Sequence, residues 1–253
     1  MIVSISPARL QDFETPTAMS KCTPPQFEKE AIYLNSILQS LSVQEIEKLM
    51  HINPKQALEV YQYVQAFEMK RTPKKQAALT YNGMAYLGLD AKTFTDDNWN
   101  FAQQHLIHFS GMYGALRPLD AIKPYRLEAL IKLPNNKGKD LYDYWSSTLT
   151  TYLAQRLEAD DNVWINLMSK EFTKLINKKS LGKEVSIITP AFKQQTANGY
   201  KQIVIYSKKA RGMMARYIIQ NKIKKVDDLK YFDAEGYSFA PDLSVKDEWV
   251  FVR

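Results

Sequence analysis

The chain has 253 residues, 45% of them hydrophobic and 24% charged, which is ordinary for a folded globular protein and allows a sizeable core. Its single cysteine, Cys22, excludes an internal disulfide and any zinc or iron–sulfur site built from a cysteine cluster. The 34 Lys and Arg residues exceed the 27 Asp and Glu residues, giving a net charge of +7, so polyanionic partners such as nucleic acid or phosphorylated molecules are favoured.

No apolar run approaches the roughly 20 residues that a membrane-spanning helix needs. The opening MIVSISPARL also lacks the basic and long apolar regions of a secretory signal. We therefore expect a cytoplasmic protein that makes no membrane contact. The sequence predicts no cofactor and sets no oligomeric state, although it is compatible with a monomer.

The first strand signal lies at the start of the chain. Ile2 to Ile5 is a short β-branched run that ends at Ser6-Pro7, which predicts a buried strand. Such a strand delivers Ser6 and Arg9 to a loop at its carboxyl end, where open α/β sheets usually place ligands. From Gln26 onward, apolar residues at helical spacing predict an amphipathic helix.

Residues 42–67 predict two helices joined by a short turn. Ser42 and Glu45 form a capping box that opens the first helix, and Pro54 occupies the first position of the second. The pattern resembles the helix-hairpin-helix motif, which presents backbone N–H groups and a helix N-terminus to a DNA phosphate. Lys55 would supply the positive charge.

Two residues of this turn depart from that motif, because His51 and Asn53 stand where it usually has glycines. Asparagine tolerates the left-handed backbone region better than most residues, and histidine tolerates it less well. An ordinary helical hairpin that packs against the core is the alternative interpretation. Both interpretations stay open.

Thr95-Asp96-Asp97 predicts the capped start of a helix whose apolar positions continue to Leu106, and His105 and His108 lie three positions apart in this region. On one helical face the two histidines could hold a metal ion if a carboxylate joined them. A structural or exposed histidine pair is the more common outcome, so we assign no metal site.

The stretch Ala102 to Glu128, AQQHLIHFSGMYGALRPLDAIKPYRLE, concentrates conformational constraints. Its two glycines indicate a close backbone approach or positive φ, and its two prolines hold turns. These turns carry Arg117 and Arg126. The two arginines either form an anion site or pair with Asp120 and Glu128.

Beyond this stretch the pattern favours alternating elements. Leu127 to Leu133 alternates enough to predict a strand. Asp140 to Leu157 has helical spacing and a heavily aromatic face, on which Tyr142, Tyr144 and Trp145 are expected to pack in the core.

The last third of the chain predicts further strands and helices. Strands are expected at Val163 to Leu167, Val185 to Ile188 and Gln202 to Tyr206, with a hairpin turn at Asn198-Gly199. Ser207 to Gly212, SKKARG, is then expected to be a basic loop that enters a helix. There, unpaired N–H groups and the helix dipole would add to the lysine and arginine charges in binding an anion.

Two more strands are expected at the end of the chain, in GYSF and WVFVR. No GxxxxGK[ST] motif is present, and no GxGxxG follows a predicted strand. NTPase and dinucleotide-binding functions therefore have little support.

Several segments together resemble the YaaA family of bacterial peroxide-stress proteins. The blocks that carry the resemblance are SPAR from Ser6, SGMYGALRPLDAIKPYRLE from Ser110, GKDLYDYW from Gly138, NLMSKEF from Asn166, KKARGMMARYII from Lys208 and GYSF from Gly236. They span the chain in order. The chain departs from the family at Arg9, Ala129 and Met168, where Lys, Met and Ala are common, and arginine keeps the charge of a lysine but offers no titratable amine.

The resemblance implies a single compact α/β (mixed α+β) domain over residues 1–253, with a mixed sheet, a basic cleft and a helix-hairpin-helix-like element at 42–67. It also implies duplex DNA binding and a part in surviving hydrogen peroxide, in which the family restrains free iron and so limits oxidative DNA damage. From the residues we expect the basic segments to converge on one cleft. Candidate phosphate-binding residues are Arg9, Lys55, Arg117, Arg126, Lys208, Lys209, Arg211 and Arg216; candidate cleft-lining residues are Ser6, Ser110, Tyr113 and Gly212.

The leading hypothesis is a non-enzymatic protein that binds the DNA backbone. One alternative is an enzyme acting on a small phosphorylated or carboxylated molecule in the same cleft, with polar or acid–base groups from Ser6, Ser110, Tyr113 and Asp120. A third hypothesis, direct iron binding through His105, His108 and acidic residues, has less support.

Overall fold

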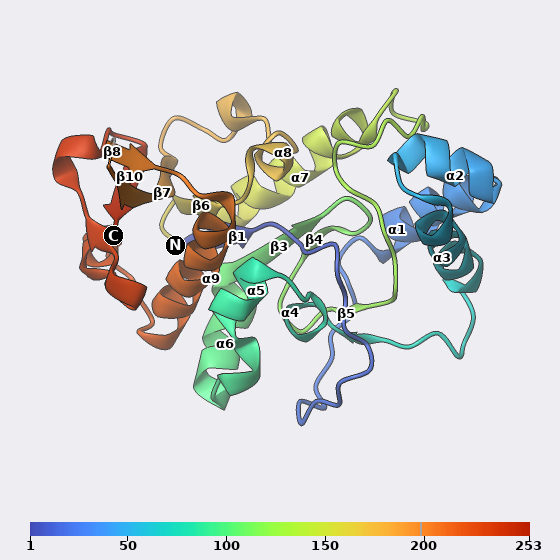
Figure 1. Cartoon of the computed structure of the whole chain (residues 1–253), viewed down its shortest axis with the longest axis horizontal. Coiled ribbons are helices and arrows are strands. Elements are labelled where there is room, and N and C mark those ends of the chain that lie inside the picture. The colour runs from blue at the N-terminus through green and yellow to red at the C-terminus, as the bar shows by residue number, and fades with distance from the viewer. Residues whose placement is uncertain (198) are drawn as a thin grey trace.

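The computed structural model describes residues 1–197 and 199–253, which fold around a mixed β-sheet (Figure 1). The strands of this sheet are β1 (Ile2–Ile5), β3 (Leu106–Ser110), β4 (Gly114–Leu116), β6 (Val163–Leu167), β7 (Ser186–Thr196), β8 (Gly199–Lys201), β9 (Ser238–Phe239) and β10 (Glu248–Val252). Their order is β4-β3-β1-β6-β7-β10-β9, with β8 paired to β7. A separate ladder pairs β2 (Lys75–Gln76) with β5 (Ala121–Ile122).

The middle of the sheet is parallel, from β3 through β1, β6 and β7 to β10. Strands β4, β8 and β9 pair antiparallel at its margins. In this register Ser4 of β1 lies opposite Ile107 of β3 and Asn166 of β6. The carboxyl ends of β1, β3 and β6 therefore meet at one edge, where the chain can bring side chains together.

Helices cover the sheet and extend beyond it toward one end of the molecule (Figure 1). The α-helices are α1 (Glu28–Gln39), α2 (Val43–Met50), α3 (Pro54–Ala66), α4 (Ala77–Thr80), α5 (Met84–Leu89), α6 (Asp96–His105), α7 (Leu141–Glu158), α8 (Lys170–Thr173) and α9 (Val204–Gln220). Short 3₁₀ helices are η1 (Ala91–Thr93), η2 (Lys178–Ser180), η3 (Val226–Tyr231), η4 (Ala234–Gly236) and η5 (Pro241–Leu243). The expected mixed α/β fold is confirmed. In the described part of the chain, none of these helices combines the length and apolar character needed to cross a membrane.

The helical hairpin expected at residues 42–67 is formed by α2 and α3. The Ser42 backbone N–H donates to the Glu45 carboxylate over 2.7 Å, which closes the predicted capping box. Asn53 caps α3 by accepting from the Gln56 backbone N–H at 2.9 Å. Between the two helices, His51 adopts the left-handed conformation with φ 52°. The turn thus has the backbone geometry that a glycine would adopt at lower cost.

Helices α5 and α9 pack face to face (Figure 1). A Cβ atom on Gly88 would meet the Lys209 carbonyl, and one on Gly212 would meet the Ala85 carbonyl. Both positions need glycine because the two backbones approach so closely. Helix α9 also contacts β1, β6 and β7, so it fixes α5 relative to the centre of the sheet.

The aromatic face of α7 belongs to the core, as predicted. Tyr144 and Trp145 are buried, and the Trp145 indole N–H donates to the Gly111 carbonyl over 2.8 Å. Gly114, at φ +66°, lies against the Trp145 ring, where a side chain would clash. Gly114 therefore lets the β3–β4 turn approach α7, whereas a Cβ on Gly111 would meet the Leu127 carbonyl.

Two predictions about the residues in and before α9 are wrong. Val204 begins α9, so the strand predicted at Gln202 to Tyr206 is wrong, and Ser207 to Gly212 lies inside the helix instead of forming a loop before it. The hairpin strands are β7 and β8, which pair antiparallel on either side of Asn198; that residue lies outside the described ranges. The anion site expected from a helix N-terminus at Ser207 to Gly212 therefore does not form in that way.

Two other local predictions are also wrong. Leu127 to Leu133 alternates buried and more exposed residues but pairs with no strand among the described residues. Helix α6 ends at His105 and His108 lies in β3, so the two histidines do not share a helical face.

Candidate functional site

A cavity of about 390 Å³ lies at the carboxyl ends of β1 and β6. Segments far apart in the sequence form its walls. They are residues 5–11 after β1, residues 82–86 at the start of α5, residues 125–128 after β5, Leu167, Ser169, Glu171 and Phe172 around the start of α8, and Lys208 and Arg211 of α9. The position matches the edge where open α/β sheets bind ligands.

Four of the candidate phosphate-binding residues converge on this cavity, namely Arg9, Arg126, Lys208 and Arg211, and Ser6 lines it with them. Glu128 and Glu171 are the carboxylates among its lining residues. The lining therefore carries a formal surplus of two positive charges. An anion is favoured at the rim, although the carboxylates make the cavity a mixed site and not a uniformly basic one.

Glu128 pairs with two of the four cations. Its carboxylate oxygen Oε1 lies 3.0 Å from Arg9 Nε and 3.1 Å from Arg126 Nη2. The Glu128 side chain is only 11% exposed, whereas that of Arg9 is 66% exposed. Arg9 can therefore swing outward to a ligand at small cost, while Arg126 is held in place.

Glu171 places a second carboxyl group in the cavity wall. Burial raises its pKa above the usual range, and the nearby Glu128 carboxylate acts in the same direction. Because both carboxyl groups are largely removed from water, neither is fully compensated by solvent. These two carboxyl groups offset part of the positive charge that the four cations bring to the lining.

The two residues of α9 complete the rim. Lys208 is exposed and Arg211 is partly buried. Burial lowers the pKa of the Arg211 guanidinium, and no described carboxylate offsets that effect. Arginine nevertheless stays charged in proteins, so Arg211 is a cation with spare hydrogen-bond donors.

Ser6 organises the inner wall. Its hydroxyl accepts a hydrogen bond from the Ser169 backbone N–H at 2.9 Å, which ties the end of β1 to the segment after β6. The Tyr86 hydroxyl donates to the Ser6 carbonyl over 3.2 Å and lies 2.9 Å from His108 Nδ1. His108 is fully buried, and burial lowers its pKa to about 3, so the ring is neutral.

A second hydrogen-bond chain lies behind Tyr125. The Tyr125 hydroxyl is 2.7 Å from the Ser110 hydroxyl and 2.6 Å from that of Tyr81. Ser110 also accepts from the backbone N–H of Tyr113 at 3.1 Å. Ser110 is therefore buried behind the cavity wall, and the Tyr113 hydroxyl accepts from the Lys123 backbone N–H at 3.1 Å.

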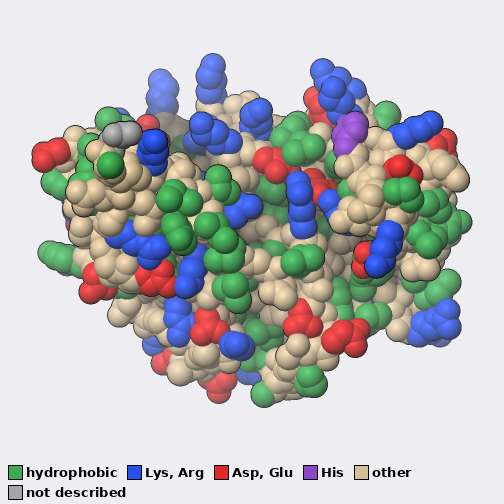
Figure 2. Space-filling view, viewed as in Figure 1, with side chains coloured by type: hydrophobic (Ala, Val, Ile, Leu, Met, Phe, Trp, Pro, Cys, Tyr) green, Lys and Arg blue, Asp and Glu red, His purple; other side chains and the backbone are tan. Residues whose placement is uncertain are grey.

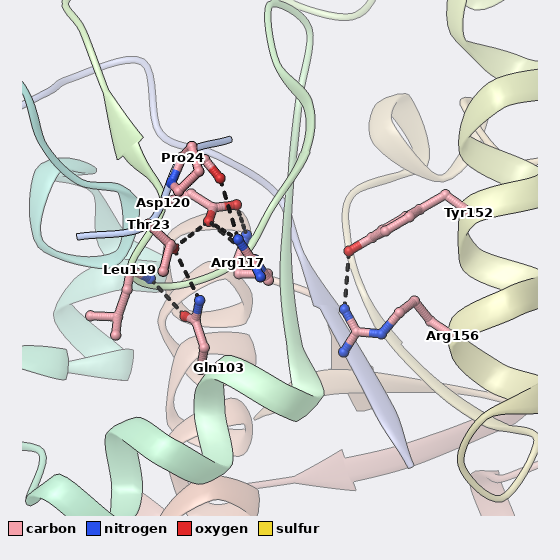
Figure 3. Close-up of polar contacts among 8 residues, drawn as sticks. All are labelled: Thr23, Pro24, Gln103, Arg117, Leu119, Asp120, Tyr152 and Arg156. Carbon is pink, nitrogen blue, oxygen red and sulfur yellow. Dashed lines mark hydrogen bonds and ion pairs between the residues drawn. The ribbon is translucent and has the colours of Figure 1, made fainter. Parts of the chain in front are cut away.

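The structure places the other candidates elsewhere. Gly212 lies on the face of α9 that packs against α5. Arg117 binds the buried Asp120 carboxylate, with Nη2 2.9 Å from Oδ1 (Figure 3). Lys209 forms an ion pair with Glu235.

Arg216 points toward the end of α5. Its guanidinium donates to the carbonyl oxygens of Leu89 and Asp90 at 3.2 and 2.9 Å and to the Thr93 hydroxyl at 2.7 Å. Neither Lys209 nor Arg216 lines the cavity.

A second hollow of about 770 Å³ adjoins the cavity and connects it to the helical hairpin. Arg9 and Arg126 line both hollows, and the second one reaches Gln56 and Glu59 of α3, beside Lys55. Lysine and arginine side chains gather along the upper edge of the molecule, and acidic and basic side chains are mixed across its centre (Figure 2). A continuous hollow thus runs from α9 to α3.

Sequence reasoning missed several cavity residues, namely Asn82, Tyr86, Tyr125, Ser169 and Glu171. Ser169 and Glu171 follow directly after β6, a position that could have marked them, because residues after parallel strands meet at one edge. The others reach the cavity only through long-range packing.

The two histidines of the iron-binding hypothesis have different partners. His105 Nδ1 lies 2.9 Å from the Asp160 carboxylate and 3.0 Å from the Met1 carbonyl, whereas His108 pairs with Tyr86. Across residues 1–197 and 199–253, no group of three or more His, Cys, Asp or Glu side chains is arranged to hold a metal ion.

The chain is similar to known proteins along its length. Residues 1–243 match the family model described as peroxide stress protein YaaA. A UPF0246 protein of Ralstonia nicotianae and one of Saccharophagus degradans are each 43% identical over 256 residues, covering 100% of this chain and 99% of the relative. A UPF0246 protein of Aromatoleum aromaticum is 43% identical over 261 residues, with the same coverage.

Proposed function

We propose that this chain, which belongs to the family of peroxide stress protein YaaA, binds duplex DNA through its backbone phosphates. Membership of that family supports a role in the peroxide stress response. The observation that carries the DNA-binding proposal is the convergence of Arg9, Arg126, Lys208 and Arg211 on one hollow that continues to α3. Cations placed along a groove are the main source of affinity for a nucleic-acid backbone.

The rim cations supply the phosphate contacts. Arg9 and Lys208 are exposed, so they can reach a phosphate without unfolding any part of the cavity. Arg211 lies deeper and has spare donors that suit an anion. Arg126 is held by Glu128, so its part is to orient the neighbouring Arg9 and to keep the rim positive.

The helical hairpin supplies a second contact at the other end of the hollow. Lys55 is exposed in the first turn of α3, where its ammonium group and the positive end of the helix dipole attract a phosphate, while the Gln56 N–H already donates to the Asn53 side chain. We place Arg117, Lys209 and Arg216 outside this contact, because carboxylates or carbonyls of the chain already hold them.

DNA binding would fit a protective role in the cytoplasm during peroxide stress. Hydroxyl radicals form where free iron meets peroxide, so restraint of free iron would lower damage to DNA held by this protein. Both effects are proposed for this chain from its family. Neither requires a cofactor bound in the cavity.

Salt dependence of duplex binding tests the proposal. If about four phosphates are neutralised, the logarithm of the association constant should fall with the logarithm of salt concentration with a slope of about −3.6. Lys208→Ala and Arg211→Ala should each reduce that slope by about one. Lys183→Ala is the matched control, because Lys183 is exposed and precedes β7, away from the carboxyl edge of the sheet.

Fluorescence anisotropy with a labelled duplex at several salt concentrations provides the measurement. Circular dichroism of each variant establishes that it is folded. Folded Lys208→Ala and Arg211→Ala variants that bind duplex DNA with the parental affinity and slope would exclude the assignment.

A further inference from the structure

Three residues that line the cavity carry buried polar atoms without a hydrogen-bond partner. Among the described residues, five buried side-chain atoms have no hydrogen-bond partner, and three of them are Arg126 Nε, Glu128 Oε2 and Glu171 Oε1. All three residues line the cavity. Buried polar atoms in folded proteins are nearly always paired, so a group of unpaired atoms beside a cavity indicates a partner from outside the chain.

The chemistry of these atoms limits what that partner can be. An ionised carboxylate only accepts hydrogen bonds, so Glu128 and Glu171 call for a ligand edge that carries N–H donors. Lys208 and Arg211 of α9 also line the cavity, and the exposed Arg9 can swing away from Glu128; these cations call for an anionic group. The ligand therefore combines N–H donors with a negatively charged group.

The remaining lining residues suit a flat apolar body. Leu127, Leu167 and Phe172 line the cavity together with the aromatic rings of Tyr86 and Tyr125. Aromatic and aliphatic surfaces of this kind pack against planar rings. A volume of about 390 Å³ is in the range of pockets that hold small molecules.

A nucleotide combines a planar donor-bearing ring with a phosphate, and guanine is the base that fits the carboxylates. Guanine presents the N1–H and N2 amino donors side by side for the two carboxylates, and its neighbouring O6 is an acceptor that suits the unpaired Arg126 Nε donor. Adenine and cytosine each place a ring acceptor beside their amino group, and thymine flanks its single N–H with two carbonyls. Those acceptors would face the carboxylate lone pairs and be repelled.

We infer that the cavity binds one guanine nucleotide, with the donor edge of the base on Glu128 and Glu171 and the phosphate at Arg9, Lys208 and Arg211. The nucleotide is either free or extruded from a DNA duplex, because both present the same chemistry. The extruded form rests on the proposed DNA binding, and the free form does not. An unpaired base is the cheapest to extrude, since unpairing otherwise costs a few kcal/mol.

The adjoining hollow supports entry of a DNA strand. Arg9 and Arg126 line both the cavity and the larger hollow that leads to α3. A strand whose backbone follows that hollow would carry its neighbouring nucleotides past Arg71, which lines the second hollow. The base of the nucleotide at the junction could then enter the cavity while its phosphate stays at the rim.

The test compares three labelled duplexes that differ only at one position: fully paired, with one unpaired dG, and with one unpaired dT. Wild-type protein should bind the dG duplex about tenfold more tightly than the dT duplex, the effect expected of one hydrogen bond to a charged group. Glu171→Gln should abolish this preference, because the amide places a donor among the donors of guanine. It should not weaken binding of the paired duplex.

Glu158→Gln is the matched control. Glu158 is an exposed glutamate at the end of α7 that precedes β6, and it should leave the dG preference intact. A fourth experiment uses calorimetry to compare the affinities of the protein for free deoxyguanosine monophosphate and for deoxyguanosine. Lys208 is exposed, so the Lys208→Ala variant should fold. It should bind the monophosphate more weakly and the nucleoside with unchanged affinity.

The outcomes separate the two proposals. Salt-dependent binding of the paired duplex without any dG preference would overturn the pocket and leave the proposed function standing. Binding of the free monophosphate that is lost in Glu171→Gln, with no binding of paired duplex, would support the pocket and overturn the proposed function. Equal binding of dG and dT duplexes together with no binding of the free monophosphate would overturn the inference outright.

Discussion

Arg117 encloses the buried carboxylate of Asp120: Nε and Nη2 lie 3.1 and 2.9 Å from Oδ1, and the Arg117 backbone N–H donates to Oδ2 over 2.8 Å. Thr23 donates to the same carboxylate over 2.6 Å, and Gln103 joins the network through Thr23 at 3.1 Å (Figure 3). Burial raises the pKa of Asp120, against the lowering effect of these hydrogen bonds. The network fastens the loop before α1 to the turn after β4.

This relationship predicts that Arg117 matters for stability more than for binding. Arg117→Ala leaves a buried carboxylate without its charged partner and should lower the free energy of unfolding by about 3 kcal/mol. Urea denaturation measures the change. Lys222→Ala, which breaks an exposed pair with Asp97, should change stability little and serves as the contrast. Equal destabilisation by the two variants would contradict the structural role given to Arg117.

The close packing of α5 on α9 predicts a strong effect of a single methyl group. Gly212→Ala places its Cβ against the Ala85 carbonyl, so the helices must move apart. Overpacking of this kind typically costs about 1–3 kcal/mol. We expect a clear fall in the thermal midpoint measured by calorimetry. Gln220→Ala, at an exposed position of the same helix, should leave the midpoint nearly unchanged.

The burial of His108 predicts that the protein loses stability in mild acid. Its native pKa is about 3, against 6.5 for the free side chain, because burial disfavours the charged ring. Below pH 6.5 this histidine binds a proton in the unfolded chain but not in the folded chain. Its contribution to folding stability is therefore complete above pH 6.5 and is lost as the pH falls toward 3. The slope due to this histidine should be about 1.4 kcal/mol per pH unit.

Chemical denaturation between pH 7.5 and 5 measures that slope. His108→Asn keeps an acceptor for the Tyr86 hydroxyl and should flatten the slope, while lowering stability at pH 7.5 because it leaves a cavity. His51→Asn at the exposed hairpin turn is the control and should leave the slope in place. A parental slope in His108→Asn would assign the pH dependence to other groups.

The helical hairpin gives a prediction that separates its two interpretations. If its N-terminal turn binds a DNA phosphate, Lys55→Ala should weaken duplex binding and reduce the salt slope by about one, with no loss of stability. His51→Gly should retain binding and should not lower stability, because glycine accepts the left-handed conformation of φ 52° at lower cost. Unchanged duplex binding by Lys55→Ala would favour an ordinary packing hairpin.

Local patterns predicted most elements of the fold because their signals lie within a few residues. The capping box at Ser42, the proline at Pro54 and the β-branched run of β1 each specify an element without help from distant residues. The strand predicted at Gln202 to Tyr206 was wrong because it was also inferred from a local signal alone. Its β-branched and aromatic residues favour a strand, but packing of α9 on α5 and the sheet stabilises a helix from Val204 onward.

Burial was predicted better than pairing. Leu127, Ala129, Ile131 and Leu133 are buried, as the alternation indicated, yet no described strand lies beside them to make a ladder. The cavity itself was only partly predictable. The ends of β1 and of the central stretch were signalled by Ser6, Arg9 and Arg126, whereas Glu171 acquires its importance only where α8 meets that stretch in space.

The position of β1 between β3 and β6 has a consequence for motion. Its backbone amides pair within the centre of the parallel sheet, so their hydrogen exchange should require global unfolding. The first turn of α9 carries the exposed side chains of Val204 and Ile205 and should exchange through local fraying. The start of α9, which leads to Lys208 and Arg211 in the cavity wall, should therefore open and close many times before β1 opens once.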